Sequence, residues 1–334
     1  MVADKYKNIF MKILIVKPSS FGDIIQANPI ISAIKSTWQT AQVDWLVFNQ
    51  WQDVIKLFSN INNIKIWNRK GGIKSFFEVL KDCNSQNYDL VIDLQGLLRS
   101  ALFTRLLKAK QKIGVSGMKE LSWLLLKEPY KRNKEENAVI RNLNSLTYIT
   151  KKNYDVNFSM NVDENLSTEI LQKENISVTD KLIAFMPFAR GKTKSWQTEK
   201  YIELSTMIKN YDNNIKIIIL GSKADYGKIK SQNIIDLCGK TNILQLASIL
   251  KKCKFVVGAD TGPMHLANSL GTNSAFIFGG SDIKETAPYG NNSITISMNL
   301  SCSPCRGKCK YNSEKCLEQI TSDMVFRSIE KWIK

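Results

Sequence analysis

The chain has 334 residues, 43% of them hydrophobic and 23% charged, and its 47 Lys and Arg against 30 Asp and Glu give a net charge of +17. A chain of this length usually forms two domains, and its composition excludes a long disordered or low-complexity protein. No apolar run approaches the roughly 20 residues that span a bilayer. The first ten residues contain an acid and no sustained apolar stretch, so we expect no secretory signal.

The excess of positive charge favours an anionic partner, such as a nucleic acid, nucleotide phosphates or an acidic membrane surface. Because the lysines are spread along the chain, solvated helix faces are an alternative explanation of the charge. We expect a cytoplasmic protein, in which the seven cysteines stay reduced and disulfides do not form.

Short β-rich runs alternate with helical patterns along most of the chain. Strands are predicted over residues 13–17, 43–48, 64–67, 90–94, 113–115, 182–186, 215–220, 234–237, 255–258 and 274–278. Helices are predicted over residues 24–37, 73–83, 97–107, 198–209, 243–251 and 321–334. This alternation predicts the α/β class, with parallel sheets covered by helices.

A polar stretch over residues 151–180 interrupts the alternation, and a new series of strands follows it. We therefore expect a first domain over 11–165 and a second over 178–320, with the last helical stretch, 321–334, belonging to either. Ligands of open α/β sheets bind at the carboxyl ends of the strands, so two such domains would hold ligands in a cleft between them.

The motif KPSSFGDIIQANP, residues 17–29, leaves the first predicted strand through a flexible loop and brings Asp23 to the start of a helix. Asp is a favoured helix cap, and its charge complements the helix dipole. A carboxylate on the ligand-binding edge of the sheet is also suited to act as a general base. The local sequence leaves both roles open.

The segment PFARGKTKSWQTEKY, residues 187–201, follows the first strand of the second half and carries Arg190, Lys192 and Lys194. These cations are placed to meet a pyrophosphate, although solvated loop residues are the simpler alternative. The dinucleotide fingerprint G-x-G-x-x-G and the P-loop G-x-x-x-x-G-K-[ST] do not occur, which argues against a nicotinamide dehydrogenase and a P-loop kinase.

The strongest local signal is FVVGADTGPMHLANSLG, residues 255–271. An apolar strand ends before Asp260, Thr261 and Gly262, and a proline then suits the start of a helix. The free N–H groups and partial positive charge of that helix start favour a phosphate group. His265, the only histidine, falls in the first turn. The alternative is that Asp260 or Thr261 caps the helix and His265 packs beside it.

Four cysteines lie close together in CSPCRGKCKYNSEKC, with the spacing C-x2-C-x3-C-x6-C. Four thiolates suit a structural zinc or iron, and they would leave no open position for catalysis. Reduced thiols or a labile redox pair are the alternatives. The residues concerned are Cys302, Cys305, Cys309 and Cys316.

The chain resembles the ADP-heptose-dependent lipopolysaccharide heptosyltransferases of glycosyltransferase family 9, from about Met11 to its end. The segments that carry the resemblance are K-x-S-S-x-G-D at 17–23, YDLVIDLQGLLRSA at 88–101, K-x-W at 194–196 and DTGPMHLA at 260–267. The start of the chain is most similar to the first heptosyltransferase of the inner-core pathway, whereas the cysteine cluster is more similar to other members.

The resemblance implies a GT-B fold, with two Rossmann-like domains facing one another across a cleft, and inverting heptose transfer that requires no metal. Asp23 corresponds to the general base. The donor-binding set is Lys194, Asp260, Thr261, Gly262 and His265 by resemblance, with Arg190 and Lys192 added from their loop. The set expected on the acceptor side is Ser19, Ser20, Gly22 and Gln95.

The resemblance also implies the partners, which are ADP-heptose and a lipid-linked Kdo/heptose saccharide at the cytoplasmic face of the inner membrane. The net charge, and a run of leucines at 124–126 followed by basic residues, would support peripheral docking. Those leucines are equally suited to a core. Asn137 stands where many relatives have His, which leaves the acceptor open.

Two other functions stay open. One is a related glycosyltransferase that uses another nucleotide sugar or a protein acceptor. The other is a nucleic-acid-binding protein with a four-cysteine metal site. The second lacks aromatic and basic recognition residues gathered in one place, so we expect no nucleic acid among the partners.

Overall fold

The computed structural model describes residues 10–116, 125, 128–131, 133, 135–298, 300–305, 308–309 and 315–334. Contacts divide the chain into two compact units, Met1–Asn161 and Val162–Lys334. The short helices that follow this boundary, η4 (Glu164–Ser167) and α7 (Thr168–Lys173), belong to the second unit. There the Ser167 N–H donates to Ser248 Oγ at 3.1 Å.

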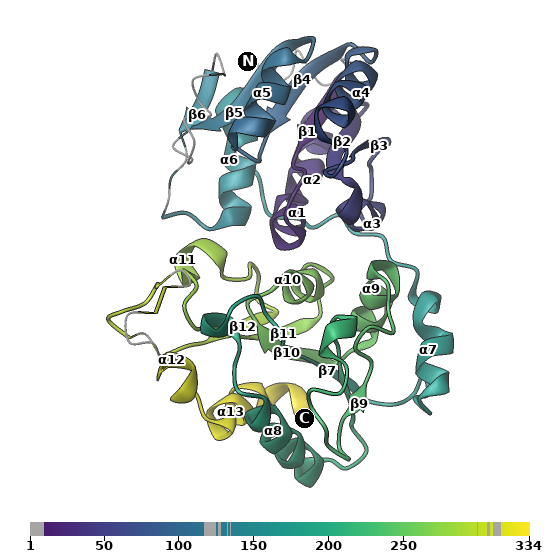
Figure 1. The fold of residues 1–334 in the computed structure, drawn as a ribbon, viewed down its shortest axis with the longest axis vertical. Coiled ribbons are helices and arrows are strands. Elements are labelled where there is room, and N and C mark those ends of the chain that lie inside the picture. The colour runs from purple at the N-terminus through teal and green to yellow at the C-terminus, as the bar shows by residue number, and fades with distance from the viewer. Residues whose placement is uncertain are drawn as a thin grey trace. The chain divides into compact units, whose positions relative to one another are not determined.

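The first unit is a parallel sheet with helices on both faces (Figure 1). Its strands are β1 (Lys12–Val16), β2 (Gln42–Phe48), β3 (Asn63–Trp67), β4 (Tyr88–Asp93), β5 (Ala109–Ser116) and β6 (Glu128–Lys131). Its helices are α1 (Phe21–Ala27), α2 (Pro29–Thr37), η2 (Asn49–Trp51), α3 (Gln52–Lys56), α4 (Gly72–Asn84), α5 (Leu98–Leu106) and α6 (Ala138–Thr150).

The second unit repeats this design. Its strands are β7 (Leu182–Met186), β8 (Lys216–Ile219), β9 (Ile235–Asp236), β10 (Phe255–Ala259), β11 (Asn273–Ile277) and β12 (Ser293–Ile296). Its other helices are η5 (Lys192–Lys194), α8 (Thr198–Tyr211), η6 (Lys223–Asp225), α9 (Ile243–Lys252), α10 (Gly262–Ser269), α11 (Ile283–Thr286), α12 (Lys315–Glu318) and α13 (Ser322–Ile333).

The two sheets have the same topology. Their strand orders are β3-β2-β1-β4-β5-β6 and β12-β11-β10-β7-β8-β9, and every neighbouring pair is parallel. Counted from the first strand of each unit, both read 3-2-1-4-5-6, which is the order of a Rossmann fold. The predicted α/β class with two parallel sheets is therefore confirmed. The sequence prediction did not include β6 and β12, which are short edge strands.

The predicted helix over residues 24–37 is in fact two helices. α1 begins three residues earlier, at Phe21, and the helical hydrogen bonding is interrupted between Asn28 and Pro29. Proline has no N–H to donate to the carbonyl four residues earlier, which here belongs to Ile25. The Asn28 N–H instead donates to the Ile25 carbonyl at 3.0 Å, and α2 starts with Pro29 in its first turn.

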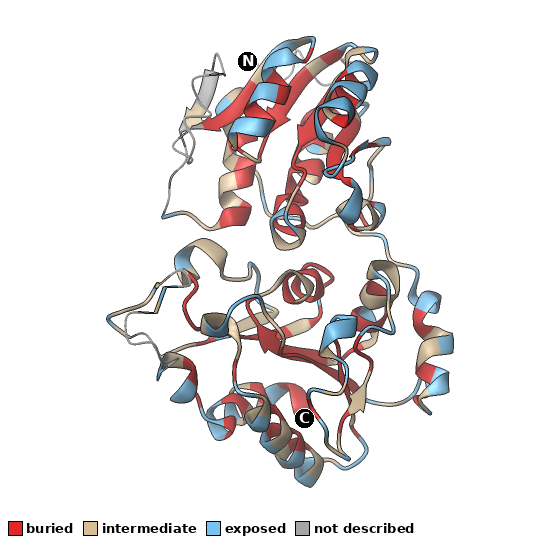
Figure 2. Cartoon of the chain, viewed as in Figure 1, coloured by how far each residue is buried: buried red, intermediate tan, exposed pale blue. Residues whose placement is uncertain are grey.

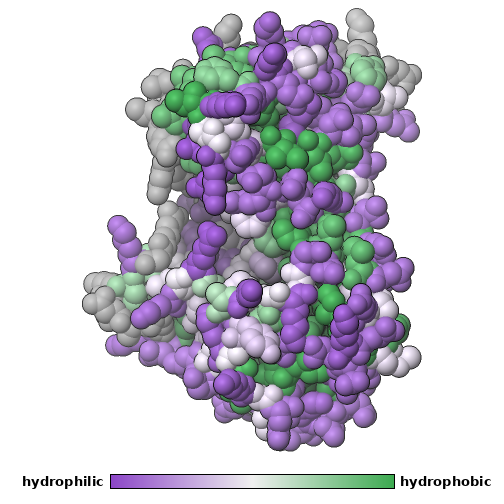
Figure 3. All heavy atoms as spheres, turned by 45° about the vertical axis from the view of Figure 1, so that its right-hand side comes forward, coloured by the Kyte–Doolittle hydropathy of each residue, from purple (hydrophilic) through white to green (hydrophobic). Residues whose placement is uncertain are grey.

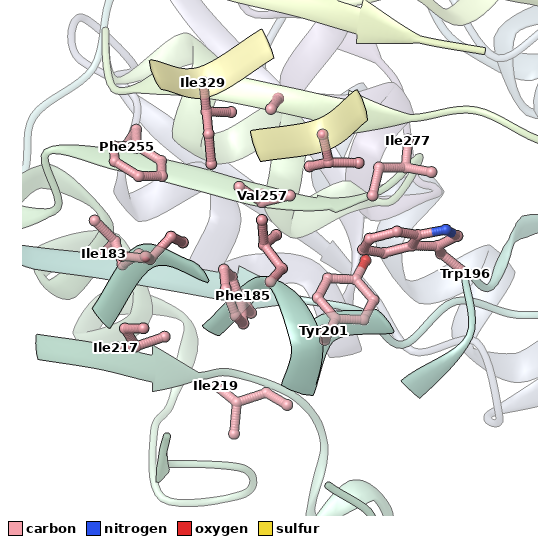
Figure 4. Close-up of a cluster of buried hydrophobic side chains, with 14 of the residues drawn as sticks. Ile183, Phe185, Trp196, Tyr201, Ile217, Ile219, Phe255, Val257, Ile277 and Ile329 are labelled. Carbon is pink, nitrogen blue, oxygen red and sulfur yellow. The ribbon is translucent and has the colours of Figure 1, made fainter. Parts of the chain in front are cut away.

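Apolar strands and the inner faces of the helices form a separate core in each unit (Figure 2). In the second unit, the ring of Tyr201 lies between Trp196, at 4.8 Å, and Phe185, at 5.5 Å (Figure 4). The Trp196 indole N–H donates to the Ile320 carbonyl at 2.9 Å. Ile329, on α13, is buried in the same core, so the last helix is part of the second unit.

Candidate functional site

The loops that carry the predicted site residues leave the strands at the switch point of each sheet. In the first unit β1 lies beside β4, and in the second unit β7 lies beside β10. At these pairs the chain continues in opposite directions along the sheet, which opens a crevice outside the carboxyl ends of the strands. The residues of the second unit's switch point come from the loops after β7 and β10, and a third loop, after β11, adds Ser281.

Asp260 is the centre of a hydrogen-bonded cluster in the second unit. It follows β10 directly and is only 6% exposed. Its Oδ2 accepts hydrogen bonds from Lys194 Nζ at 2.8 Å and from Ser281 Oγ at 2.6 Å. Its Oδ1 lies 3.1 Å from Nε2 of the buried His265. The three partners therefore hold both carboxylate oxygens.

The surroundings of Asp260 decide its ionisation. Burial alone would raise the pKa of this carboxyl, but the hydrogen bond and charge of His265, with those of Lys194, lower the pKa well below its usual range. Asp260 is thus a carboxylate at neutral pH and keeps Lys194 pointed at the end of β10. The Lys194 side chain is 37% exposed, so its ammonium group remains accessible to a ligand.

Tight backbone packing fixes the loops around this cluster. The Gly280 N–H donates to the Thr193 carbonyl at 2.8 Å, which ties the Lys194 loop to the loop after β11. A Cβ at Gly279 would lie 2.2 Å from the same carbonyl oxygen. In the Lys194 loop itself, Gly191 has φ +96°, a conformation that side chains disfavour. These glycines allow the close approach of the two loops.

The start of α10 lies next to the cluster. Thr261 is the N-cap residue with an extended backbone, and Gly262 and Pro263 open the first turn. The N–H groups of a first turn have no carbonyl partner within their helix, so together with the dipole they favour an anion. Thr261 and Gly262 are partly exposed, whereas His265 behind them is buried. The arrangement suits a phosphate at Thr261 and Gly262, with Lys194 beside it.

The other two predicted donor-binding cations lie outside this cluster. Arg190 and Lys192 are exposed on the loop after β7, and neither has an ion pair with a residue that the structure describes. Only Lys194 of the three is joined to the end of β10. Of the three cations on this loop, Lys194 is thus held by a defined contact, whereas the other two are exposed to solvent.

Asp23 lies in the first turn of α1 in the first unit and is exposed. Its Oδ2 accepts hydrogen bonds from the Ser20 N–H at 3.1 Å and from the Ser20 hydroxyl at 2.5 Å. The N-cap residue is therefore Ser20, and Asp23 takes part in capping from the third helical position instead of being the cap residue that the sequence suggested. The cap holds the carboxylate at the carboxyl end of β1, with one oxygen directed at Ser20.

The expected acceptor-side residues come from the two loops at the first unit's switch point. The Ser19 N–H donates to Gln95 Oε1 at 3.2 Å, which links the loop after β1 to the loop after β4. Ser20 caps α1, and Gly22 lies in its first turn. These residues therefore border Asp23 within one unit.

Asp93, the last residue of β4, is a buried carboxylate that the sequence prediction did not select. Its Oδ1 accepts hydrogen bonds from the N–H groups of Gln95 at 2.9 Å and Gly96 at 3.2 Å, which close the turn. Complete burial raises the pKa of Asp93 to about 6, although those amides and the charge of Lys17 act to lower it. The sequence did contain a signal for this residue, because an acidic side chain at the end of an apolar strand is placed at the ligand-binding edge of a parallel sheet.

Comparison with known proteins identifies the family. The family model described as "Glycosyltransferase family 9 (heptosyltransferase)" matches residues 76–316, which is more than half of the chain. The chain belongs to glycosyltransferase family 9. It is therefore a glycosyltransferase, as the resemblance of its motifs implied.

Individual family members match over most of their length. Lipopolysaccharide heptosyltransferase 1 of Campylobacter coli is 26% identical, covering 80% of this chain and 84% of the relative. Lipooligosaccharide heptosyltransferase 2 of Campylobacter jejuni is also 26% identical, covering 96% and 99%. The structure of E. coli heptosyltransferase WaaC with ADP has a TM-score of 0.78 at 22% identity, covering 96% and 100%. This glycosyltransferase thus has the GT-B fold of two Rossmann-like domains.

The cysteine segment of the glycosyltransferase packs on its Asp260 cluster. Cys305 Sγ lies 4.0 Å from the Gly280 carbonyl oxygen, next to Ser281. Burial, together with the nearby Cys305 and Cys302, raises the pKa of the Cys316 thiol. Among the described residues, no three His, Cys, Asp or Glu side chains are arranged to hold a metal ion. The zinc or iron stays a prediction.

Proposed function

We propose that this glycosyltransferase moves heptose from ADP-heptose to the Kdo/heptose inner core of lipopolysaccharide, with inversion at the anomeric carbon. The observation that carries the donor assignment is the Asp260 cluster beside the start of α10. The relatives support the sugar and the acceptor, since they are lipopolysaccharide and lipooligosaccharide heptosyltransferases, and one was solved with ADP.

The donor's pyrophosphate is proposed to bind at Thr261, Gly262 and Lys194. When the bond between the anomeric carbon and the phosphate oxygen breaks, its electron pair leaves with ADP and negative charge grows on the phosphate. A lysine ammonium and the N–H groups of a helix start stabilise this charge more in the transition state than in the ground state. Arg190 and Lys192 are proposed to reach the same phosphates from their exposed loop.

Asp23 is proposed to act as the general base. It would accept the proton of an acceptor hydroxyl while that oxygen forms its bond to the anomeric carbon, opposite the departing ADP. The two hydrogen bonds from Ser20 hold this carboxylate in place. The cap and the base are thus compatible roles of one residue. Ser19, Ser20, Gly22 and Gln95 are proposed to line the acceptor side.

No divalent metal is required in this scheme, because Lys194 and the α10 start supply the stabilising charge. Four thiolates would in any case leave no open position for catalysis. A structural zinc or iron at the four cysteines is kept as a separate proposal, supported by their spacing. Elemental analysis of protein purified without chelator tests it, and protein free of zinc and iron would contradict it.

The acceptor of the proposed reaction is lipid-linked, so the glycosyltransferase is proposed to work at the cytoplasmic face of the inner membrane. No helix that the structure describes combines the length and apolarity needed to cross a bilayer. Attachment would therefore use surface side chains, helped by the net charge of +17.

The test is transfer by purified protein from ADP-heptose to a panel of Kdo-lipid and heptosyl-Kdo-lipid acceptors, with the product mass as the readout. The expected product gains one heptose, and an excess of EDTA leaves the rate unchanged. Absence of product with every acceptor would overturn the proposal. Faster hydrolysis or transfer with a different nucleotide sugar, or transfer to a protein, would favour the related glycosyltransferase considered from the sequence.

A further inference from the structure

The outer face of α4 and α5 carries an unusual number of exposed large hydrophobic side chains. Ile73 is 77% exposed and Phe77 56% on α4, and on α5 Leu98, Leu102 and Leu106 are 47%, 42% and 44% exposed. Residues four apart lie on one side of a helix, so each helix presents an apolar stripe to solvent. We call these five residues the α4–α5 patch.

The patch is distinct from the core that the same helices cover. Val79 and Leu80 on α4, and Phe103 on α5, are buried against the sheet. The rings of Phe76 and Phe103 lie 5.7 Å apart and join the two helices. α4 and α5 therefore lie side by side on one face of the first sheet (Figure 1), and the exposed parts of both are visible in Figure 2. Each helix therefore has two apolar sides, one buried against the sheet and one exposed to solvent.

Basic side chains surround the patch. Lys74 on α4 and Arg99 and Arg105 on α5 are exposed, and none of them has an ion pair with a described residue. Asp82, an acid on α4, is paired with Lys65 at 2.9 Å, and Glu78 also lies on the exposed side. Figure 3 shows hydrophobic residues reaching the surface of the first unit among hydrophilic ones. Cations at the border of apolar side chains match the phosphate layer and acyl layer of a bilayer.

The position of the patch connects it to the acceptor loops of the same unit. α4 and α5 begin after β3 and β4, so Ile73 and Leu98 lie at the carboxyl edge of the sheet. Leu98 follows Gln95 by three residues, and Gln95 accepts a hydrogen bond from the Ser19 N–H. A surface that binds at Leu98 is therefore close to the side on which the acceptor is expected.

We propose that the α4–α5 patch docks the protein on an anionic phospholipid bilayer, with its apolar side chains among the acyl chains and Lys74, Arg99 and Arg105 at the lipid phosphates. The proposal rests on the proposed function, because that function presents the acceptor in a membrane. A second copy of this chain is a poorer occupant, since it would bring two bodies of charge +17 together. The leucines at 124–126, considered from the sequence, include residues 124 and 126, which lie outside the described residues.

The test is sedimentation of the full-length protein with vesicles of phosphatidylethanolamine and phosphatidylglycerol, compared with vesicles of phosphatidylcholine alone. We expect binding to the anionic vesicles that weakens with salt. Two variants address the two parts of the patch, Phe77→Ser with Leu102→Ser and Arg99→Glu with Arg105→Glu. Each is expected to reduce the partition coefficient by about 10-fold or more, because each removes two lipid-facing cations or two large apolar side chains.

A matched control is Val178→Ser in the second unit, where Val178 is 83% exposed and lies outside the patch. This variant is expected to bind vesicles like the unaltered protein. Thermal unfolding should change little in all variants, because the substituted side chains lie at the surface and Leu102, the least exposed of the apolar ones, is still 42% exposed. A loss of stability would show that the patch residues support the fold and would contradict a purely docking role.

Transfer assays separate this proposal from the proposed function. With a water-soluble, delipidated acceptor, the patch variants should work at the unaltered rate, and with acceptor in vesicles they should be slowed. Vesicle binding that the variants do not change would overturn the docking proposal while leaving the enzymatic one intact. A change from dimer to monomer in the variants would show instead that the patch joins two copies, and would also overturn it.

Discussion

Each sheet has a buried aspartate at the carboxyl end of its fourth strand. The surroundings of these two aspartates shift their pKa values in opposite directions. Asp93 closes β4 and is held by backbone amides, and its complete burial raises its pKa to about 6. Asp260 follows β10, where His265 and Lys194 lower its pKa well below the usual range despite burial. The carboxyl end of the fourth strand thus carries a carboxylate that closes a turn in one unit and a carboxylate that holds Lys194 and His265 in the other.

This difference is consistent with the proposed role of each unit. Around Asp260, a lysine and a buried histidine are held at the edge where a helix begins, which suits an anionic donor. Around Asp93, the hydrogen bonds fix the turn of Gln95, whose side chain accepts from the Ser19 N–H. Substitution of either aspartate, or of its partners, tests whether the two aspartates differ in this way.

Among changes to the two aspartates and their partners, Asp260→Ala is expected to have the largest effect on turnover. The change leaves Lys194, His265 and Ser281 without their shared acceptor, and turnover is expected to fall by about 100- to 1,000-fold, in the range for loss of an electrostatic contributor to catalysis. ADP binding, followed by calorimetry, should weaken as well. Asp212→Ala is the control, because it breaks an exposed ion pair with Lys181 in the same unit. Equal effects of the two substitutions would contradict a special role of the cluster.

Lys194→Ala is expected to have a smaller effect than Asp260→Ala. Its matched control is Lys192→Ala. Loss of a hydrogen bond from a charged group to a phosphate corresponds to roughly a 10- to 100-fold weaker affinity. Lys192, two residues earlier, is exposed and outside the cluster, so its loss should have a several-fold smaller effect on ADP affinity. If Lys192→Ala weakens ADP binding more than Lys194→Ala, the assignment of the phosphate site is wrong.

The third effect concerns stability and its dependence on pH. Because the pKa of Asp93 is raised in the folded protein, to about 6 from 3.8, the folded state binds the extra proton and stability falls as pH rises from about 4 to about 6. Ionising this buried group costs on the order of 3 kcal/mol at pH 7. Asp93→Asn keeps an acceptor for the two amides and removes the titration.

Urea unfolding of the Asp93→Asn variant at pH 4 and pH 7.5 checks this prediction. The variant should gain stability relative to the unaltered protein at pH 7.5 and show little difference at pH 4. For Asp260 the sign is reversed, since its lowered pKa gives stability that is present above about pH 4 and is lost as the pH falls further. If Asp93→Asn gains less stability over the unaltered protein at pH 7.5 than at pH 4, the account of Asp93 is contradicted.

The sequence was informative where chemistry and periodicity agreed. Apolar strands such as Leu182–Met186 and Phe255–Ala259 predicted the parallel sheets, and their order in the chain put Lys194 and Asp260 on one edge. The break before Pro29 was also readable, because proline cannot donate a helical hydrogen bond. The apolar spacing continues across this break, and the spacing alone predicts a single helix.

Other features depend on distances that no local pattern contains. Ser281 lies 21 residues beyond Asp260, and only the pairing of β10 with β11 brings its hydroxyl to the carboxylate. The raised pKa of Asp93 follows from complete burial, which requires the packed sheet. The exposed stripes of α4 and α5 look like core residues in the sequence, since burial separates the two apolar faces only in the folded unit.

The most direct test of the central claim is heptosyl transfer by Asp23→Asn, measured with saturating ADP-heptose and acceptor beside Ser20→Ala. Asn keeps the size of the side chain and an oxygen for the Ser20 cap but cannot take a proton, so transfer should fall at least about 1,000-fold while ADP binding and thermal stability are retained. Ser20→Ala removes a hydroxyl donor but leaves the carboxylate of Asp23, so it should cost about 0.5–2 kcal/mol of stability and lower transfer far less than Asp23→Asn. Transfer by Asp23→Asn at a rate close to that of Ser20→Ala would contradict the general base and leave Asp23 as a helix cap alone.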